Sequence, residues 1–309
     1  MYTPSNIQYI DYNIYMMYLV LGKTGYIGGA FVKELEKRGL PHLALSRDYK
    51  INSISVDYSA MNWEFDWGLE QLANPSLHEE LTVINCAGYV GKPNVDACEK
   101  NKAKTILGNV SLPQYLSHLC HRHGANFAHI SSGCIYSGSK DFTETDTPNF
   151  ALNSGGSFYS GTKALAEEIV SGNKKAWQFR LRIPFDEQAS PRNYLTKCLS
   201  YDQLIDVENS ISHRGDFVSA CLDLMEKEAP FGIYNVCNPG AVTTQQVAEM
   251  LSTKFPEKKF DFFADYESFE SETVAARSNC TLNTDKLLKY VDIRTAEEAL
   301  ISSIDKYTQ

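Results

Sequence analysis

Tyr159 and Lys163 are the two side chains whose types and spacing most directly suggest chemistry in this chain of 309 residues. They lie in Ser157-Phe-Tyr-Ser-Gly-Thr-Lys163, at the start of a stretch with helical spacing. Because residues four apart share one face of a helix, the phenol and the ammonium should point the same way. A cation beside a tyrosine lowers the phenol pKa from about 10, which suits proton transfer to a carbonyl group. The spacing also arises by chance on helix surfaces, so its meaning depends on a neighbouring cofactor site.

A glycine-rich loop near the start of the chain predicts such a site. Residues 22–28 have the pattern G-x-x-G-x-x-G, with an apolar run predicting a strand before them and helical spacing over 25–39 after them. In that context glycines let the backbone approach a pyrophosphate, and the helix N-terminus presents N–H groups and a positive dipole. We therefore expect a dinucleotide to contact the whole loop, which consists of Gly22, Lys23, Thr24, Gly25, Tyr26, Ile27 and Gly28.

The end of the second predicted strand, at 42–46, distinguishes between dinucleotides. An acidic residue there would bind a ribose 2′-hydroxyl, whereas Arg47 suits a 2′-phosphate and Lys23 could add a second cation. Asp48 follows at once and weakens this preference. We expect NADP(H), with NAD(H) tolerated. Asp57 is a candidate for contact with the adenine, and a simple turn aspartate is the equally good alternative.

The order of elements predicts an α/β protein with a Rossmann-type, doubly wound parallel sheet. Apolar runs of strand length alternate with helical stretches, and such alternation favours right-handed crossover units with helices on both faces. The further strands are expected at 81–88, 127–132 and 176–182, and the helical stretches at about 94–121 and 158–171.

After Pro184 the segments become shorter and more mixed, which predicts a smaller mixed α/β substrate-binding region at the C-terminal end. We expect a flexible extension over 1–16, an NADP-binding Rossmann domain over 17–183, and the substrate-binding region over 184–309. No linker rich in Gly, Ser or Pro separates the last two. We therefore expect interleaved segments rather than an independent second domain.

Composition argues against several classes of function. The net charge of −9 gives no electrostatic footprint for nucleic acid or an anionic membrane, and no apolar run is long enough to span a bilayer. The first residues lack the basic start of a secretory signal, and none of the eight cysteines forms a C-x-x-C pair. We expect a cytoplasmic protein with reduced thiols. We interpret His118, His121 and His123 as the polar end of a helix, so no metal site is expected.

Ser131-Ser-Gly-Cys134-Ile-Tyr follows the fourth predicted strand, and here the chain resembles the extended short-chain dehydrogenase/reductases. The resemblance covers nearly the whole chain from Met17. It includes, in order, the glycine loop, Asn85-Cys-Ala-Gly88, Asn109, Ser132 and the pair Tyr159 and Lys163. It implies that Ser132, Tyr159 and Lys163 form the reducing triad. It also implies that Tyr159 and Lys163, with Asn85, Ala87 and Gly88, border the cofactor NADPH.

The chain is more closely similar to the bifunctional 3,5-epimerase/4-reductases of nucleotide-rhamnose synthesis. The stretches that carry this similarity include Gly88–Glu99, Gly133-Cys134-Ile, Pro148-Asn-Phe, Gly156–Ser160, Pro191–Lys197, Tyr234–Gly240 and Arg277-Ser-Asn279. The similarity implies a UDP- or dTDP-linked 4-keto-6-deoxyglucose as substrate, supplied by a separate 4,6-dehydratase, and UDP-β-L-rhamnose as a product. Relatives of this type often form homodimers.

The chemistry of such a substrate needs two further groups. A ketone at C4 acidifies the C–H bonds at C3 and C5, and inverting either centre needs acid/base groups on both faces of the sugar. The resemblance assigns these roles to Cys134 and Lys197. It assigns substrate contacts to Asn193, Arg277 and Asn279, and a surface ion pair is an equally good reading of Arg277.

Two other functions stay open at this point. One is a dTDP-4-dehydrorhamnose reductase without epimerase activity. The other is a non-catalytic, NADP-binding regulatory subunit of the same fold, against which the retained Ser132, Tyr159 and Lys163 argue.

Overall fold

A computed structural model describes residues 16–46, 50–51, 54–55, 61, 63–74 and 80–308 of the chain. Strand β1 begins at Met16, so the rest of the expected extension lies outside the described residues. Six parallel strands form the central sheet in the order β13-β8-β6-β5-β1-β2. Their bounds are Met16–Leu21 for β1, His42–Leu45 for β2, Glu80–Asn85 for β5, Asn126–Ser132 for β6, Ala176–Leu181 for β8 and Gly232–Asn235 for β13. The predicted fold class is confirmed.

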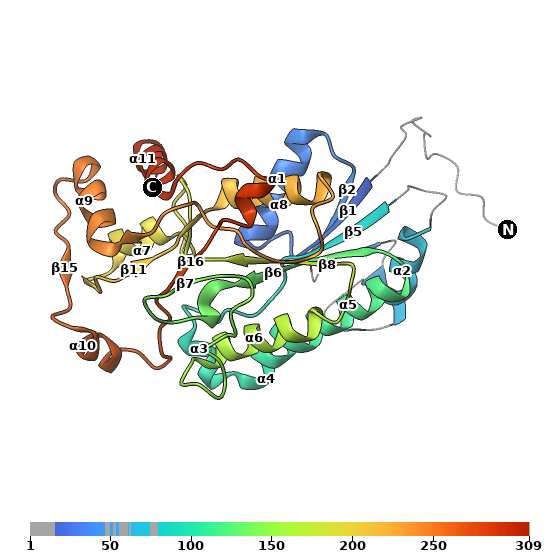
Figure 1. Ribbon diagram of the computed structural model, residues 1–309, viewed down its shortest axis with the longest axis horizontal. Helices are drawn as coiled ribbons and strands as arrows, with labels where there is room; N and C mark the ends of the chain where they lie inside the picture. The colour runs from blue at the N-terminus through green and yellow to red at the C-terminus, as the bar shows by residue number, and fades with distance from the viewer. Residues whose placement is uncertain are drawn as a thin grey trace.

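Helices cover both faces of this sheet (Figure 1). Alternate residues of a strand point to opposite faces, and β1 shows how both faces are filled. Tyr18 and Val20 pack into a core with α1 (Tyr26–Arg38) and α8 (Arg214–Glu226). Leu19 and Leu21 pack into a second core with α2 (Trp63–Leu72) and α5 (Leu112–Arg122). Burial of both strand faces therefore follows from the continuous apolar runs in the sequence.

The helical stretch expected over 94–121 is divided in the structure. It comprises α3 (Asp96–Lys100), α4 (Lys102–Ile106), a π-helical turn over Leu107–Ser111 and then α5. Asn101 has φ −121° and ψ 50°, outside the helical region, and this separates α3 from α4. The buried Asn109 in the π-helical turn accepts from Tyr89 N at 2.7 Å and donates to Tyr89 O at 2.9 Å. The turn thus ties this face of the sheet to the loop after β5.

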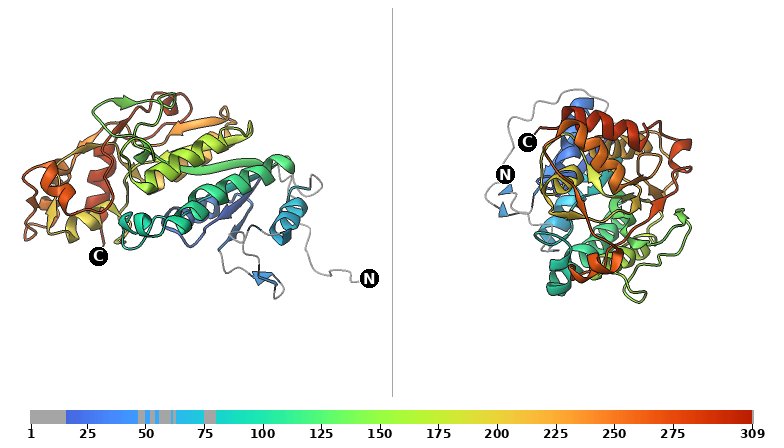
Figure 2. Two further views of the ribbon diagram at one scale, coloured as in Figure 1. Left: turned by 90° about the horizontal axis from the view of Figure 1, so that it is seen from below. Right: turned by 90° about the vertical axis from the view of Figure 1, so that its left-hand side faces the viewer.

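The C-terminal segments build a smaller unit with a core of its own, beyond the carboxyl end of the sheet (Figures 1 and 2). Helices α7 (Tyr194–Ser200), α9 (Thr244–Lys254) and α11 (Ala296–Lys306) supply most of that core. Strand β13 and helix α8 also come from beyond residue 184, yet they complete the sheet layer. The two regions therefore interleave.

Short elements complete the described chain. The two-residue strands pair as β3 (Lys50–Ile51) with β4 (Ile54–Ser55), β7 (Asp141–Phe142) with β16 (Thr281–Leu282), β9 (Pro184–Phe185) with β12 (Ser212–His213), β10 (Gln203–Leu204) with β15 (Asp261–Phe262), and β11 (Glu208–Asn209) with β14 (Val242–Thr243). The remaining helices are α6 (Phe158–Val170), α10 (Tyr266–Ser271) and the 3₁₀ turns Gly133–Ile135 and Leu287–Lys289.

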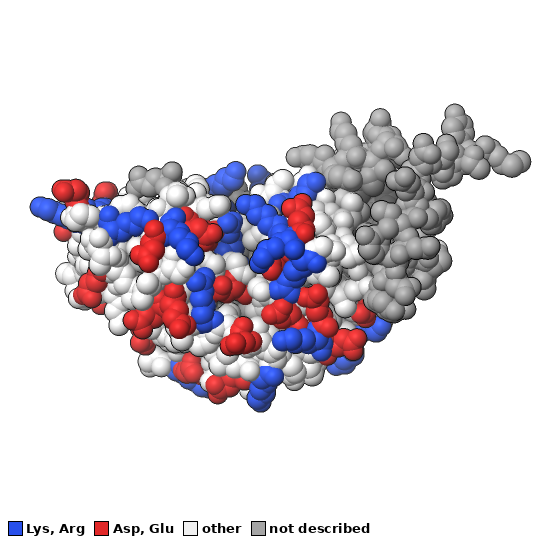
Figure 3. Space-filling view, turned by 90° about the horizontal axis from the view of Figure 1, so that it is seen from above, with Lys and Arg blue, Asp and Glu red and all other residues white. Residues whose placement is uncertain are grey.

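The face seen in Figure 3 mixes basic and acidic side chains. Within the described ranges, no helix combines the length and the apolar content needed to cross a membrane. In the same ranges, no group of three or more His, Cys, Asp or Glu side chains is arranged to hold a metal ion.

Candidate active site

The glycine loop is packed so closely that two of its positions admit no side chain. Gly22 has φ +88°, which favours glycine, and a Cβ there would lie 3.0 Å from Ala87 N. A Cβ on Gly28 would lie 2.2 Å from Gly22 O. The loop runs from the end of β1 into the first turn of α1, whose N–H groups have no partner within the helix. This arrangement fits a dinucleotide pyrophosphate, as expected from the sequence.

Gly28→Ala is expected to destabilise the protein and weaken dinucleotide binding. The added methyl group would overlap the carbonyl of Gly22, and overpacking of this kind typically costs about 1–3 kcal/mol. If about 1.4 kcal/mol of this cost destabilises the loop conformation that binds NADPH, the Kd for NADPH rises about tenfold. Thermal unfolding and calorimetric titration measure the two effects.

Gly68→Ala is the matched control for this substitution. Gly68 lies in α2, and a Cβ there would meet nothing within 4 Å. The change should leave NADPH binding unaltered and raise stability by about 0.5–1 kcal/mol, because alanine favours helix. Equal NADPH affinity in the Gly28 and Gly68 variants would contradict the assigned role of the loop.

The loop after β5 lies against the glycine loop, as the approach of Gly22 to Ala87 shows. Gly88 approaches Asn109, whose Oδ1 would lie 3.2 Å from a Cβ at that position. Asn85, however, is fully buried and accepts from Ala87 N at 3.1 Å. Its amide nitrogen faces His129 Nδ1 at 3.2 Å. This amide therefore shapes the loop, and the expected contact between Asn85 and the cofactor stays a prediction.

Two residues expected at the cofactor cannot be placed. Arg47 and Asp57, the candidates for the 2′-phosphate and the adenine, both lie outside the described residues. Lys23 is described, and its backbone N–H donates to Leu45 O at 3.1 Å, which fixes the loop against β2.

Ser132 and Tyr159 are brought together by the end of β6 and the first turn of α6. Ser157 caps α6 by accepting from Ser160 N, and Glu99 accepts from Phe158 N at 2.6 Å. The Ser132 hydroxyl lies close enough to the Tyr159 phenol to lower its pKa, and it also accepts from Cys134 N at 3.3 Å. The hydroxyl, the phenol and the thiol predicted to act on one carbonyl therefore lie close together.

Burial raises the pKa of Tyr159, and the hydrogen bond with Ser132 and the charge of Arg192 only partly oppose this. The pKa of Tyr159 is thus shifted upward overall, opposite to the direction expected from a neighbouring Lys163. Lys163 Nζ donates to Ile130 O at 2.7 Å and lies 3.4 Å from His129 Nε2. Burial lowers the pKa of Lys163 to about 8, although Cys134, Glu167 and Cys86 act in the opposite direction.

A cavity of about 510 Å³ opens beside this centre, between the sheet and the C-terminal region. Tyr159, Cys134 and Lys197 all line it. Burial raises the pKa of the Cys134 thiol. Burial also lowers the pKa of the Lys197 ammonium, and the neighbouring Arg192 and Arg277 add to this effect. The structure thus places in one cavity two groups that sequence reasoning assigned to epimerisation.

The three predicted substrate residues have different surroundings. Arg277 lines the cavity and pairs with Asp96 at 2.8 Å, so the ion pair is present and the contact with substrate phosphate stays a prediction. Asn279 also lines the cavity, and its amide donates to Tyr266 OH at 3.1 Å. Asn193 is fully buried and caps α7 by accepting from Leu195 N at 2.9 Å, while its amide donates to Asp186 and to Gln188 O. Asn193 is not among the described residues that line the cavity, and its contact with the substrate stays a prediction.

Sequence reasoning missed two cations in the cavity wall. Arg192 donates to Gly91 O at 2.9 Å, and Arg182 is buried and donates to Asn209 Oδ1 and Ser278 O, each at 2.5 Å. Arg182 Nε is buried and has no hydrogen-bond partner among the described residues. Arg192 lies inside a stretch that carries the family resemblance, which was the available signal.

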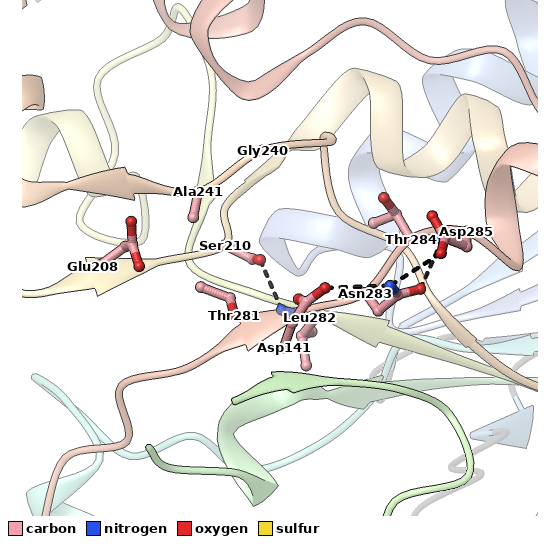
Figure 4. Close-up of a pocket in the computed structure, with 10 residues that line it drawn as sticks. All are labelled: Asp141, Glu208, Ser210, Gly240, Ala241, Thr281, Leu282, Asn283, Thr284 and Asp285. Atoms are coloured by element: carbon pink, nitrogen blue, oxygen red, sulfur yellow. Dashed lines mark hydrogen bonds between the residues drawn. The ribbon is translucent and has the colours of Figure 1, made fainter. Parts of the chain in front are cut away.

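A smaller hollow of about 320 Å³ lies between β16 and the loop at Gly240 (Figure 4). Asn283 Nδ2 donates to Asp141 and to Asp285 there, each at 3.2 Å. None of the predicted site residues is among the described residues that line it. The site is therefore assigned to the cavity of about 510 Å³, which predicted site residues line.

A parallel Rossmann-type sheet, a glycine loop and a Ser–Tyr–Lys centre define the class of the protein as an oxidoreductase of the short-chain type. A family model described as the RmlD substrate-binding domain matches residues 16–309. The chain belongs to this family.

Individual relatives agree with this assignment. A bifunctional dTDP-4-dehydrorhamnose 3,5-epimerase/dTDP-4-dehydrorhamnose reductase of Arabidopsis thaliana is 31% identical over 93% of this chain and 92% of its own. A trifunctional UDP-glucose 4,6-dehydratase/UDP-4-keto-6-deoxy-D-glucose 3,5-epimerase/UDP-4-keto-L-rhamnose-reductase of the same plant is 32% identical over 93% of this chain, which spans 41% of that enzyme.

Solved structures show the same fold. The L780 UDP-rhamnose synthase of Acanthamoeba polyphaga mimivirus has a TM-score of 0.81 at 23% identity, covering 94% of this chain and 99% of its own. A dTDP-4-dehydrorhamnose reductase of Clostridium acetobutylicum has a TM-score of 0.74 at 19% identity, covering 94% and 99%.

Proposed function

We propose that this protein is a bifunctional 3,5-epimerase and NADPH-dependent 4-reductase. It converts UDP-4-keto-6-deoxy-D-glucose to UDP-β-L-rhamnose. The observation that carries this proposal is the single cavity lined by Tyr159, Cys134 and Lys197. The names of the full-length bifunctional relative and of the matching part of the trifunctional enzyme support the same pair of reactions.

The reducing centre consists of Ser132, Tyr159 and Lys163. NADPH supplies the hydride to C4, and a relative of similar fold is described in complex with NADP. Tyr159 donates the proton to the developing alkoxide, since burial keeps its phenol protonated by raising its pKa. Ser132, which lies beside that phenol, polarises the carbonyl oxygen. NADH is expected to be a weaker substitute.

The epimerising pair consists of Cys134 and Lys197. Because the pKa of Lys197 is lowered, its neutral amine is available at lower pH than that of an ordinary lysine. Because the pKa of Cys134 is raised, its thiol keeps its proton to higher pH. We therefore assign removal of the sugar proton to Lys197 and return of a proton to Cys134 at the opposite face.

The cations of the cavity suit a nucleotide diphosphate. Four basic side chains line it, namely Arg182, Arg192, Lys197 and Arg277, against the two acidic residues Asp96 and Glu272. Arginine forks match phosphate oxygens, so an NDP-sugar is favoured over a neutral ketone. A 4,6-dehydratase, an activity that the name of the trifunctional relative includes, would supply the substrate.

Turnover of the 4-keto sugar tests this proposal. With UDP-4-keto-6-deoxyglucose and NADPH, we expect stoichiometric NADPH oxidation and formation of the rhamnose nucleotide, resolved by chromatography. Turnover of the pre-epimerised 4-keto-rhamnose nucleotide alone would indicate a reductase without epimerase activity. No NADPH oxidation with the UDP or the dTDP form of either sugar would leave the non-catalytic alternative.

A further inference from the structure

Three buried polar side chains form a row behind the reducing centre. Asn85 ends β5, His129 lies on β6 and Lys163 lies on α6, and all three are at least nine-tenths buried. His129 Nδ1 lies 3.2 Å from Asn85 Nδ2, and His129 Nε2 lies 3.4 Å from Lys163 Nζ. His129 therefore connects an amide to the lysine of the triad.

The amide of Asn85 has a defined direction. Its Oδ1 accepts from the backbone N–H of Ala87 at 3.1 Å, and a backbone N–H can only donate. The other end of the amide, which faces His129, is therefore the NH₂ group, which also only donates. It follows that Nδ1 of His129 is an acceptor and carries no proton.

The remaining nitrogen of His129 then carries the proton. Complete burial holds the pKa of His129 well below its usual range, so the imidazole is neutral. A neutral imidazole has one N–H, and with Nδ1 occupied as an acceptor this proton is on Nε2. The Nε2–H group faces Lys163 Nζ.

This contact discriminates between the two charge states of Lys163. An ammonium has three donors and no acceptor, so it would oppose the Nε2–H dipole. A neutral amine can accept from His129 Nε2–H while it donates to Ile130 O at 2.7 Å. Both side chains are therefore satisfied only when Lys163 is neutral.

We propose that His129, with its tautomer set by Asn85, disfavours the ammonium form of Lys163 and makes this lysine a titrating group of the reducing centre. His129 is thus a positioning residue that acts through Lys163. Burial acts in the same direction, whereas Cys86 after β5, Cys134 in the 3₁₀ turn and Glu167 on α6 favour the charge. A pKa of about 8 for Lys163 agrees with this balance.

The tautomer of His129 can be measured on the unmodified protein. With labelled histidine, long-range proton–nitrogen correlations distinguish the two neutral tautomers and the imidazolium. We expect His129 to remain neutral with the proton on Nε2 between about pH 5 and pH 8, the range in which an unperturbed imidazole changes its charge. A proton on Nδ1, or a doubly protonated ring near pH 6, would overturn the proposal.

The kinetic consequence rests on the proposed reductase activity and is tested separately. In His129→Gln, the amide can turn its oxygen toward Lys163 and stabilise the ammonium. We expect the pH midpoint of the reductive rate that reports Lys163 to rise by about one unit. His118→Gln, on the exposed face of α5, is the matched control and should leave the midpoint unchanged.

An unshifted midpoint in a folded His129→Gln variant would refute the assigned influence on Lys163. If that variant does not fold, the tautomer measurement still decides the proposal. If the wild-type protein oxidises no NADPH, the proposed function fails, while the tautomer measurement stands on its own.

Discussion

Tyr159→Phe is expected to lower the rate of NADPH oxidation by about 10²–10⁴-fold, the usual contribution of a positioned proton donor. The change removes only the phenol oxygen, which lies near Ser132 at the cavity. Without it, the alkoxide that forms at C4 receives no proton from α6. The rate is measured by the loss of NADPH absorbance with saturating 4-keto sugar.

The first step should survive this substitution, because Cys134 and Lys197 are unchanged. In deuterated water, the Tyr159→Phe variant should still incorporate deuterium at C3 and C5 of the unreduced sugar. Tyr115→Phe, on α5 in the core beneath the sheet, is the matched control and should oxidise NADPH at the wild-type rate. Wild-type reduction by the Tyr159 variant would remove this residue from the mechanism.

Cys134→Ala and Lys197→Ala should each suppress epimerisation by about 10²–10⁴-fold while sparing reduction. Each variant removes one of the two acid/base groups that line the cavity. With the pre-epimerised 4-keto-rhamnose nucleotide, both variants should still oxidise NADPH. Conversion of the unepimerised sugar to the rhamnose nucleotide by both variants would refute the bifunctional proposal.

The pH dependence of epimerisation provides a second measurement on the same pair. The lowered pKa of Lys197 means that its base form appears as pH rises through a value below the ordinary 10.4. The raised pKa of Cys134 means that its proton is lost only at pH above the ordinary 8.5. We expect a bell-shaped dependence of the epimerisation rate on pH. Its acidic limb should move in a Lys197 variant and its alkaline limb in a Cys134 variant. Lys174→Ala, at an exposed site after α6, is the control and should leave both limbs unchanged.

Local patterns predicted the sheet because each strand is a short apolar run buried on both faces. The glycine loop could also be recognised from the sequence, because the strand, the glycines and the helix follow one another along the chain. Helix α2 was not anticipated, and the break at Asn101 was not visible in the spacing of the apolar residues. Both depend on packing against elements that are distant in the chain.

The site was predicted less completely, because its polar partners come together only in the fold. Asn85 and His129 are 44 residues apart, and the sequence does not indicate the contact that fixes the Asn85 amide. Asn193 is similarly occupied by Asp186. The raised pKa of Tyr159 reflects burial, which the four-residue spacing from Lys163 could not indicate. Arg182, which directly follows β8, is buried and lines the cavity, and the sequence did not indicate this either.

Incubation of the wild-type protein with UDP-4-keto-6-deoxyglucose and NADPH in deuterated water tests the central claim most directly. The cavity that holds Tyr159, Cys134 and Lys197 predicts a rhamnose nucleotide carrying deuterium at both C3 and C5. Mass spectrometry and proton spectra of the product report the two positions separately. A reduced product that retains protium at both carbons would contradict the epimerase half of the account.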